Sequence, residues 1–323
     1  MKKFPRIVFF GTPDFAVTSL SRLVASGYTV VAVVTAPDKP AGRGLKEKAS
    51  PVKEFALLHA IPVLQPLNMK DPLFLHQLSI FKPDLQIVIA FRMMPKLIWS
   101  LPPLGTFNLH ASLLPQYRGA APINRAIMNG EHETGVTTFF LNEQIDAGKI
   151  LLSERVSIHP DETAGALHDR LMETGSEIVL RTVEGIVKGT IMETLQESMI
   201  DPSASLRTAP KIFREDCQIN WNQEVLPIHN FIRGLSPYPG AYTHLILPDG
   251  TSPVLKILKG SPEKGNPDVI PGKFVTDGKT YLKVGAIDGF FLITELQLSG
   301  RKAMNSVDFL RGFHGIFPET RAI

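Results

Sequence analysis

Asn108 and His110 are the residues of this 323-residue chain whose types and spacing best fit catalysis. They lie two positions apart on a short predicted strand that begins at Thr106, so both side chains leave the same face of that strand. An amide donor beside an imidazole can hold a carbonyl oxygen while negative charge develops on it. A buried, hydrogen-bonded Asn/His pair would show the same spacing. Geometry alone therefore leaves a catalytic and a structural interpretation open.

Asp146 is a third candidate, about thirty-five residues further along the chain. It follows a predicted strand, residues 136–141, in the turn Ile145-Asp146-Ala147-Gly148. Aspartate is a common turn former, and it gains a chemical interpretation only if the fold brings it to His110. Spacing does not decide between these two interpretations.

Other kinds of site are disfavoured. The first predicted strand-to-helix turn, Gly11-Thr12-Pro13-Asp14, has one glycine where a dinucleotide-binding fingerprint needs three, so we expect neither nicotinamide nor flavin. Gly11 fits a tight turn and a close ligand approach equally well. The nine histidines form no His-Glu-x-x-His pattern and Cys217 is the only cysteine. We therefore expect no metal and no intrachain disulfide.

The elements that must position these residues alternate through the first 190 residues. Apolar runs predict buried strands at 5–10, 28–34, 85–90 and 106–109, and helical spacing predicts helices at 13–26, 51–60 and 163–188. This alternation predicts a doubly wound, Rossmann-like α/β domain with a mainly parallel sheet. Because such sheets bind ligands at the carboxyl ends of their strands, the loop 112–119 after His110 falls at the ligand-binding edge.

The sequence changes in character after Gly189. Residues 199–210 are polar with two prolines and predict a linker. Beyond them we expect a helix at 224–235 and short strands at 241–247, 254–258, 279–284 and 290–298, separated by turns. Short strands of this kind predict a small, OB-like β-barrel. The predicted domains are therefore residues 1–198 and 211–323, joined by the linker 199–210.

Composition limits the classes of protein that remain. A hydrophobic fraction of 44% with 20% charged residues is that of a soluble globular chain. No apolar run approaches the roughly 20 residues that span a bilayer, and the run 7–10 is too short for a signal peptide, so we expect no membrane association and a cytoplasmic location. The net charge of +3 lies wholly in residues 206–323, a weak sign of a polyanionic partner. No strong self-pairing surface is visible, so we expect a monomer.

Several motifs together point to one family. An Asn-x-His-x-Ser-Leu-Leu-Pro run followed by Asp-x-Gly is specific to folate-dependent formyltransferases, and the chain resembles that family over its full length. The Gly-Thr-Pro-Asp-Phe start, a basic loop and a separate C-terminal domain resemble its methionyl-tRNA formyltransferase branch. The residues that carry the resemblance are 10–16, 37–44, 108–115, 117–123, 134–137 and 146–148.

The resemblance implies the reaction and the catalytic roles. In this family a formyl group moves from the co-substrate 10-formyltetrahydrofolate to the α-amine of methionine on initiator tRNA. By resemblance, Asn108 donates a hydrogen bond to the oxyanion and His110, as imidazolium, is the second donor. Asp146 then orients His110, favours its charged form and assists proton movement. Residues 1–198 become the catalytic domain and residues 211–323 the tRNA-binding domain.

The resemblance also implies the binding residues. The loop 36–46, predicted to be exposed, is expected to contact the tRNA acceptor end, and the first turn is expected to form a substrate loop. One departure is visible, since residues 90–95 read Ala-Phe-Arg-Met-Met-Pro where the family has Ala-Tyr-Gly-x-Ile-Leu-Pro, one residue longer. The family's pterin contacts in that segment are therefore not defined by the motif. The implied folate-binding residues are Ser112, Leu113, Leu114, Pro115, Phe91 and Arg92; the tRNA-binding residues are Lys39, Arg43 and Lys46; the substrate loop is Gly11, Thr12 and Pro13.

In the C-terminal domain, basic side chains are expected to contact RNA phosphates. The candidates are Lys256, Lys259, Lys273, Lys279, Lys283, Arg301, Lys302 and Arg311.

Three other functions compete. The nearest is a folate-dependent formyltransferase acting on a sugar-nucleotide amine, which shares the catalytic domain. The others are an RNA-binding protein that has lost activity, disfavoured by the intact Asn108, His110 and Asp146, and a nicotinamide oxidoreductase, disfavoured by the missing glycines.

Overall fold

The computed structural model describes residues 4–41, 46–200, 205–247, 250–265, 270–313 and 321–322. The chain forms two compact units, each made of several segments. The first comprises residues 1–119, 134–156 and 168–208, and the second residues 120–133, 157–167 and 209–323. The division at the linker 199–210 stays a prediction, because the compact units group two short segments of the N-terminal part with the C-terminal part.

The first unit is built on a seven-stranded sheet of order β10-β9-β7-β6-β1-β2-β5. Neighbouring strands from β7 to β5 are parallel, and β9 runs antiparallel to β7. This confirms the Rossmann-like, mainly parallel sheet. The strands are β1 (Arg6–Gly11), β2 (Thr29–Val34), β5 (Val63–Leu64), β6 (Leu85–Ile89), β7 (Thr106–His110), β9 (Glu133–Phe140) and β10 (Ile150–Ser157).

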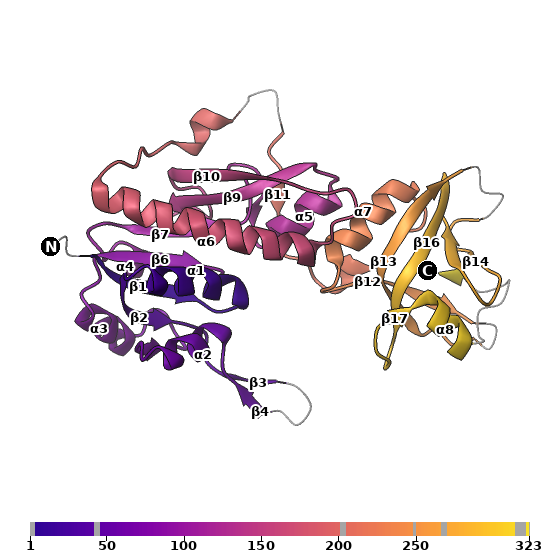
Figure 1. Ribbon diagram of the computed structural model, residues 1–323, viewed down its shortest axis with the longest axis horizontal. Coiled ribbons are helices and arrows are strands. Elements are labelled where there is room, and N and C mark those ends of the chain that lie inside the picture. Colours follow the sequence, from indigo (N-terminus) through magenta and orange to yellow (C-terminus); the bar gives the residue numbers. More distant parts are fainter. Residues whose placement is uncertain are drawn as a thin grey trace. The chain divides into compact units, whose positions relative to one another are not determined.

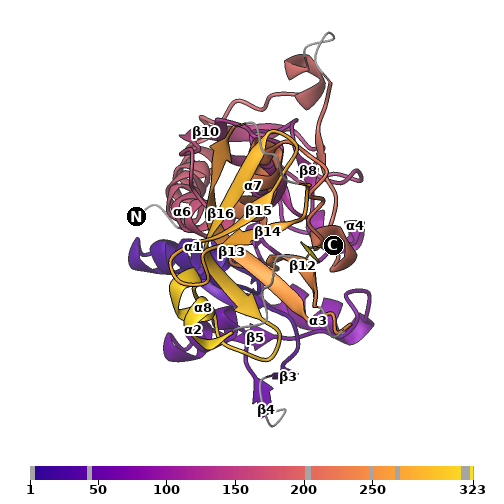
Figure 2. The ribbon, with the colours of Figure 1, turned by 90° about the vertical axis from the view of Figure 1, so that its right-hand side faces the viewer.

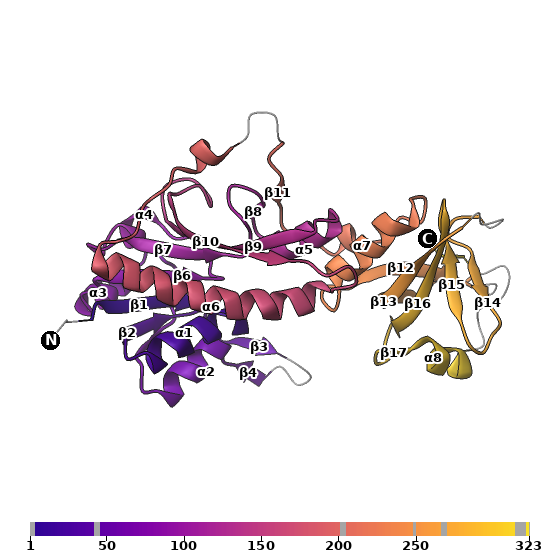
Figure 3. The same cartoon turned by 45° about the horizontal axis from the view of Figure 1, so that its top comes forward.

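Helices cover both faces of this sheet (Figures 1 and 3). On one face Val8 and Val88 pack with α3 and α4. On the other face α6 approaches so closely that a Cβ at Gly175 would lie 2.7 Å from the Leu109 side chain. The helices are α1 (Asp14–Ala25), α2 (Pro51–Leu58), α3 (Pro72–Ile80), α4 (Lys96–Trp99) and α6 (Ala164–Lys188). Since β7 alternates, Asn108 and His110 lie on the face opposite Leu109.

The second unit contains a nearly closed antiparallel barrel of order β14-β15-β16-β13-β12-β18 (Figure 2). A bridge between Lys273 and Arg321 connects its two ends. Apolar residues of α7, such as Ile228 and Ile232, pack into the barrel core beside Phe291. The elements are α5 (Pro122–Met128), α7 (Val225–Leu235), β12 (Ala241–Ile246), β13 (Val254–Lys264), β14 (Phe274–Thr276), β15 (Leu282–Gly285), β16 (Gly289–Leu298), β17 (Met304–Asn305), α8 (Ser306–Gly312) and β18 (Arg321–Ala322).

The segment 36–46 differs from its prediction as a simple exposed loop. Its ends form a small hairpin, β3 (Lys39–Ala41) and β4 (Lys46–Lys48), in which Pro40 pairs with Glu47. A two-stranded ribbon consists of edge strands alone, and edge strands accept proline. Figure 3 shows this hairpin projecting from the sheet beyond β2.

Four short elements complete the described chain: β8 (Arg118–Gly119), the 3₁₀ helices η1 (Gln196–Met199) and η2 (Glu215–Cys217), and β11 (Thr208–Ala209). Among the described residues no helix combines the length and apolar character needed to cross a bilayer.

Candidate active site

His110 ends β7 at the carboxyl edge of the parallel strands, with its side chain only 7% exposed. Its Nε2 lies 2.8 Å from the backbone carbonyl oxygen of Tyr117. A carbonyl can only accept a hydrogen bond, so Nε2 carries the hydrogen and donates. The other ring nitrogen, Nδ1, is therefore the atom at which His110 can gain or lose a proton.

Asp146 lies beside that second nitrogen. Its Oδ2 is 3.9 Å from His110 Nδ1 and accepts a hydrogen bond of 2.9 Å from the backbone amide of Gly119. Asp146 has a φ of +51°, in the left-handed region that costs energy for residues other than glycine. The fold thus brings together the aspartate and the histidine that sequence spacing could not connect. The Asp146 carboxylate faces the ring nitrogen of His110 that does not donate to Tyr117.

Asn108 shares the face of β7 with His110 and is half-buried. Its register partners are Val88 on β6 and Phe139 on β9, so strands flank it on both sides. Within the described part of the chain the Asn108 amide makes no hydrogen bond. A half-buried, uncommitted amide can donate to a substrate oxygen, whereas the imidazole of His110 is already oriented by two neighbours.

The loop after His110 is held by one threonine of the neighbouring strand β9. Thr137 Oγ1 donates to the carbonyl oxygen of Ser112 at 2.7 Å and accepts from the amide of Leu114 at 3.2 Å. Ser112 Oγ donates to the carbonyl oxygen of Gln116 at 2.7 Å, and the peptide bond before Pro115 is cis. The three hydrogen bonds hold the turn rigidly at the edge of the sheet.

The two leucines of this turn differ in environment. Leu114 is buried with Phe139 and Ile150 in a small apolar cluster, whereas Leu113 is half-buried. Leu114 therefore fills the core, and Leu113 leaves apolar surface at the turn. Folate binding by residues 112–115 stays a prediction.

Phe91 and Arg92 follow β6 at the same edge. The Phe91 ring packs edge-on against Phe10, with centroids 5.7 Å apart. The Arg92 guanidinium donates to the carbonyl oxygens of Pro66 and Leu67, the latter at 3.0 Å, and lies 5.7 Å from the Phe91 ring. Arg92 therefore ties the loop after β5 to the segment after β6. Contact of either residue with folate stays a prediction.

The first turn shows a structural reason for its glycine. A Cβ on Gly11 would lie 2.6 Å from the Ala16 Cβ, so the residue allows α1 to pack against the end of β1. Pro13 precedes α1 and accepts from the amide of Ala16 at 3.0 Å. Thr12 Oγ1 accepts from the amide of Ala36, at 3.4 Å. These contacts support the tight-turn interpretation, and a substrate contact here stays a prediction.

The base of the β3–β4 hairpin is fixed by side chains. Asp38 pairs with Lys53 of α2 and accepts from Gln65 Nε2 at 2.8 Å. Hydrogen bonds from Lys53 and then from Gln65 hold the pKa of the Asp38 carboxyl below its ordinary value. Lys39 is exposed beside this anchor. Of the predicted tRNA-binding residues, Arg43 and the side chain of Lys46 lie outside the described residues.

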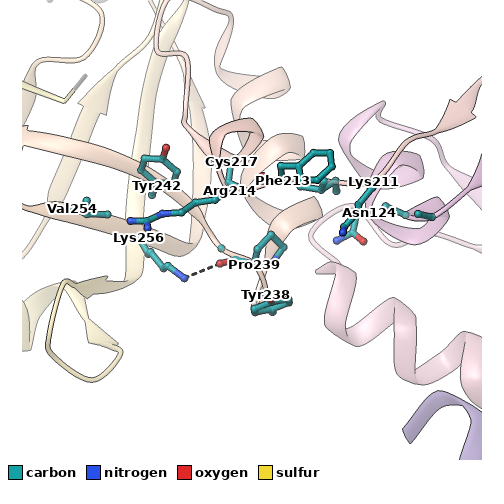
Figure 4. A pocket seen from close by; sticks show the side chains of 14 residues that line it. Asn124, Lys211, Phe213, Arg214, Cys217, Tyr238, Pro239, Tyr242, Val254 and Lys256 are labelled. Carbon is teal, nitrogen blue, oxygen red and sulfur yellow. Dashed lines mark hydrogen bonds between the residues drawn. The ribbon is translucent and has the colours of Figure 1, made fainter. Parts of the chain in front are cut away.

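A cavity of about 560 Å³ in the second unit combines positive charge with exposed aromatic rings (Figure 4). The Phe213 and Tyr238 side chains are 51% and 82% exposed, and Lys211 Nζ lies 5.1 Å from the Phe213 ring centroid. Lys256 Nζ donates to the carbonyl oxygen of Pro239 at 2.8 Å. The other charged or aromatic lining residues are Arg214 and Tyr242.

Sequence reasoning found only Lys256 among these lining residues. The signal it missed is the mixture of basic and aromatic residues in Lys211-Ile-Phe213-Arg214, just after the predicted linker. Three of the predicted C-terminal contacts form ion pairs with acidic side chains, and their contact with RNA stays a prediction. They are Lys259 with Glu295, Lys283 with Glu263 and Arg311 with Asp308. In the described ranges no three His, Cys, Asp or Glu side chains gather as a metal site.

Comparison with known families decides the identity of this arrangement. The Formyl transferase family model matches residues 5–183, and the model of the Formyl transferase C-terminal domain matches residues 211–314. The chain belongs to the formyl transferase family. The two family models together cover most of this formyl transferase, and the family resemblance stated from the motifs is confirmed.

Relatives extend the match over almost the whole chain. A methionyl-tRNA formyltransferase of Bacteroides fragilis is 51% identical over 96% of this chain and 95% of its own length. The enzyme of the same name from Phocaeicola vulgatus is 52% identical over 97% of both chains.

Solved structures share the fold at lower identity. A sugar 3N-formyl transferase, WlaRD, aligns with a TM-score of 0.62 at 21% identity over 93% of this chain and 100% of that chain. HypX from Aquifex aeolicus in complex with tetrahydrofolic acid aligns with a TM-score of 0.64 at 19% identity over 95% of this chain and 47% of that chain. This member therefore shares its fold with a sugar formyl transferase and with about half of a protein solved with tetrahydrofolic acid.

Proposed function

We propose that this protein transfers the formyl group of 10-formyltetrahydrofolate to the α-amino group of methionyl initiator tRNA, giving N-formylmethionyl-tRNA for translation initiation. The observation that carries the proposal is the site itself, in which His110 lies between a backbone carbonyl and Asp146 with an uncommitted Asn108 beside it. The methionyl-tRNA formyltransferases that are 51% identical over nearly the full length support the choice of acceptor.

The chemistry is acyl transfer to an amine. A neutral amine attacks the formyl carbon, and the formyl oxygen gains negative charge in the tetrahedral intermediate. The attacking amine then loses a proton, the bond between the formyl carbon and the folate nitrogen breaks, and the leaving folate nitrogen takes up a proton. Asn108 donates to that oxygen through its uncommitted amide. His110, with Nε2–H held by the Tyr117 carbonyl, accepts the amine proton at Nδ1, the ring nitrogen that faces the Asp146 carboxylate, and returns a proton to the leaving nitrogen.

The donor binds at the carboxyl edge of the parallel strands. The rigid turn of residues 112–115 presents apolar surface next to backbone polar groups, which suits the edge of a pterin ring. Phe91 adds an aromatic wall from the next strand. Arg92 contributes by holding the loop after β5, because its guanidinium donates to two carbonyls of that loop.

The RNA is bound by two kinds of surface. The β3–β4 hairpin carries Lys39, Arg43 and Lys46 and contacts the acceptor end of the tRNA. In the second unit, the cavity lined by Phe213, Tyr238 and three cationic side chains suits unpaired nucleotides, since bases stack on aromatic rings and phosphates pair with cations. The proposed enzyme acts as a monomer in the cytoplasm.

The test compares acceptors. Purified protein is incubated with radiolabelled formyl donor and either methionyl initiator tRNA or a nucleotide-sugar amine, and formylated product is counted. We expect formylation of the charged tRNA alone. Formylation of the sugar amine instead would replace the proposed acceptor, and formylation of neither would reject the proposed function.

A further inference from the structure

Gln196 is a fully buried polar residue in an otherwise exposed segment. It begins η1 (Gln196–Met199) with 0% of its surface exposed, while Leu195 and Met199 on either side are 56% and 49% exposed. The usual order of burial is thus reversed, with leucine and methionine outside and the amide inside. A buried amide persists only where its hydrogen-bonding groups are satisfied.

Both the nitrogen and the oxygen of the Gln196 side-chain amide make hydrogen bonds, and all of their partners belong to the first unit. Nε2 donates to the carbonyl oxygens of Asp146 and Gly148, at 2.9 and 2.8 Å. Oε1 accepts from Nε and Nη2 of Arg118, at 3.0 and 2.7 Å. One side chain therefore joins the turn of Asp146 to the segment that contains Arg118.

Both segments held in this way touch His110. Arg118 lies between Tyr117, whose carbonyl accepts from His110 Nε2, and Gly119, whose amide donates to Asp146 Oδ2. Tyr117 and Asp146 have φ values of +59° and +51°, so both backbones occupy the sparsely populated left-handed region and need outside support. Gln196 supplies that support from a distant part of the sequence.

We propose that Gln196 is a positioning residue for formyl transfer. It touches no substrate, and it fixes the Asp146 carboxylate and the Tyr117 carbonyl on the two sides of His110. This inference rests on the proposed function of His110 and Asp146. It adds that the geometry of the His110–Asp146 pair is set by a residue that follows Asp146 by fifty positions.

Two substitutions of Gln196 distinguish its hydrogen bonds to the carbonyls of Asp146 and Gly148 from those that it accepts from Arg118. Gln196→Glu keeps oxygens that accept from Arg118, but it places a carboxylate oxygen against the carbonyls of Asp146 and Gly148. Gln196→Met keeps the length and removes every polar contact. We expect kcat for formylation to fall about 10- to 100-fold in both, because a misplacement of about 1 Å costs on the order of 100-fold. KM for each substrate should stay within about twofold.

The matched control is Glu197→Ala, the next residue of the same 3₁₀ helix and exposed to solvent. It should retain the kcat of the wild-type protein. If Glu197→Ala lowers kcat as strongly as Gln196→Glu does, the effect belongs to the whole segment and the positioning role is rejected.

A double-mutant cycle gives the deciding measurement. If Gln196 acts through Asp146, then Gln196→Glu should lower kcat no further in an Asp146→Asn background. If Gln196 has only a general structural role, the losses of kcat from Gln196→Glu and Asp146→Asn should multiply in the double variant. Multiplicative losses, or a wild-type kcat in Gln196→Glu, would overturn the inference.

A readout without RNA keeps this test separate from the proposed function. Hydrogen exchange of the Gly119 amide, which donates to Asp146, should become faster in Gln196→Glu and stay unchanged in Glu197→Ala. Unchanged exchange in Gln196→Glu would overturn the positioning role. A wild-type protein that fails to formylate methionyl-tRNA would reject the proposed function, while this exchange result would still stand.

Discussion

The proposed catalytic edge of the first unit and the cavity of the second unit are built in opposite ways. His110 and Asp146 have side chains 7% and 17% exposed, and each is held by backbone groups. In the cavity, Phe213 and Tyr238 are 51% and 82% exposed. Bond-making needs atoms fixed to within a fraction of an ångström, whereas stacking and phosphate pairing tolerate mobile side chains. The comparison predicts that substitutions at the edge lower the rate of formylation, whereas substitutions in the cavity raise KM for methionyl-tRNA.

The largest losses should come from the catalytic edge. We expect Asn108→Ala to lower the single-turnover rate of formylation by about 100- to 1,000-fold, as for the loss of one oxyanion donor. His110→Ala should lower it by about 100-fold or more, as for the loss of a group that transfers the proton. Thermal unfolding should show an intact fold in both variants. A near-normal single-turnover rate would reject the oxyanion assignment of Asn108 in the first variant and the proton-transfer role of His110 in the second.

This edge is also the part of the site that could be predicted best. Period-two alternation places Asn108 and His110 on one face of a strand, and the apolar runs before them predict a parallel sheet. A turn at Asp146 could be predicted, but no local pattern shows that this turn brings the carboxylate to His110. Gln196 depends on contacts with residues 118, 146 and 148, which lie far away in the sequence.

The second unit was predicted only in outline. Turn signals and short alternating runs give a barrel, but β13 extends to Lys264 where residues 254–258 were expected. Antiparallel pairing with β16 carries it on through Gly260 and Pro262, two residues that weaken a strand by propensity. The cavity was missed because exposed aromatic residues from separate segments meet only in the fold.

The next largest effect concerns the hairpin. Arg43→Ala should lower formylation of methionyl-tRNA by about 10- to 100-fold, and Arg43→Lys should recover only part of it, because a guanidinium pairs with phosphate in a bidentate fork that lysine lacks. Binding of the folate donor should change little. Both variants are assayed for formylation and for donor binding side by side. Wild-type formylation by Arg43→Ala, or an equal loss of donor binding, would show that the loop does not hold the RNA.

Smaller effects are expected in the cavity. Phe213→Ala and Tyr238→Ala should each raise KM for methionyl-tRNA about 5- to 10-fold with kcat nearly unchanged, since stacking contributes about 1–3 kcal/mol per base. Lys211→Ala should instead reduce the slope of log KM against log salt by about 1. Replacement of the paired Lys259 is the control. A fall in kcat with constant KM would mean that this region takes part in positioning the chemistry.

The smallest expected effect concerns a buried histidine of the second unit. His229 of α7 is 4% exposed, and its Nε2 lies 3.3 Å from Asp161 Oδ1. Burial, and then the positive charge of Arg233, lowers the pKa of His229 in the folded protein. As the pH falls below about 6.5, the unfolded chain therefore binds a proton before the folded chain does, and the free energy of unfolding decreases. Above that pH both states hold His229 neutral, and this residue adds no pH dependence.

His229→Gln, which stays neutral throughout, should therefore lose less stability than the wild-type protein between pH 7.5 and 5.5. The expected difference in the free energy of unfolding is at most about 1.4 kcal/mol per pH unit. The melting temperature of each protein, recorded at each pH, reports this difference. His76→Gln, at an exposed position of α3, is the control and should follow the wild-type curve. An equal pH dependence in His229→Gln and wild type would show that His229 does not govern the acid stability of the second unit. A weaker dependence in His229→Gln would assign part of the loss of stability in acid to this histidine.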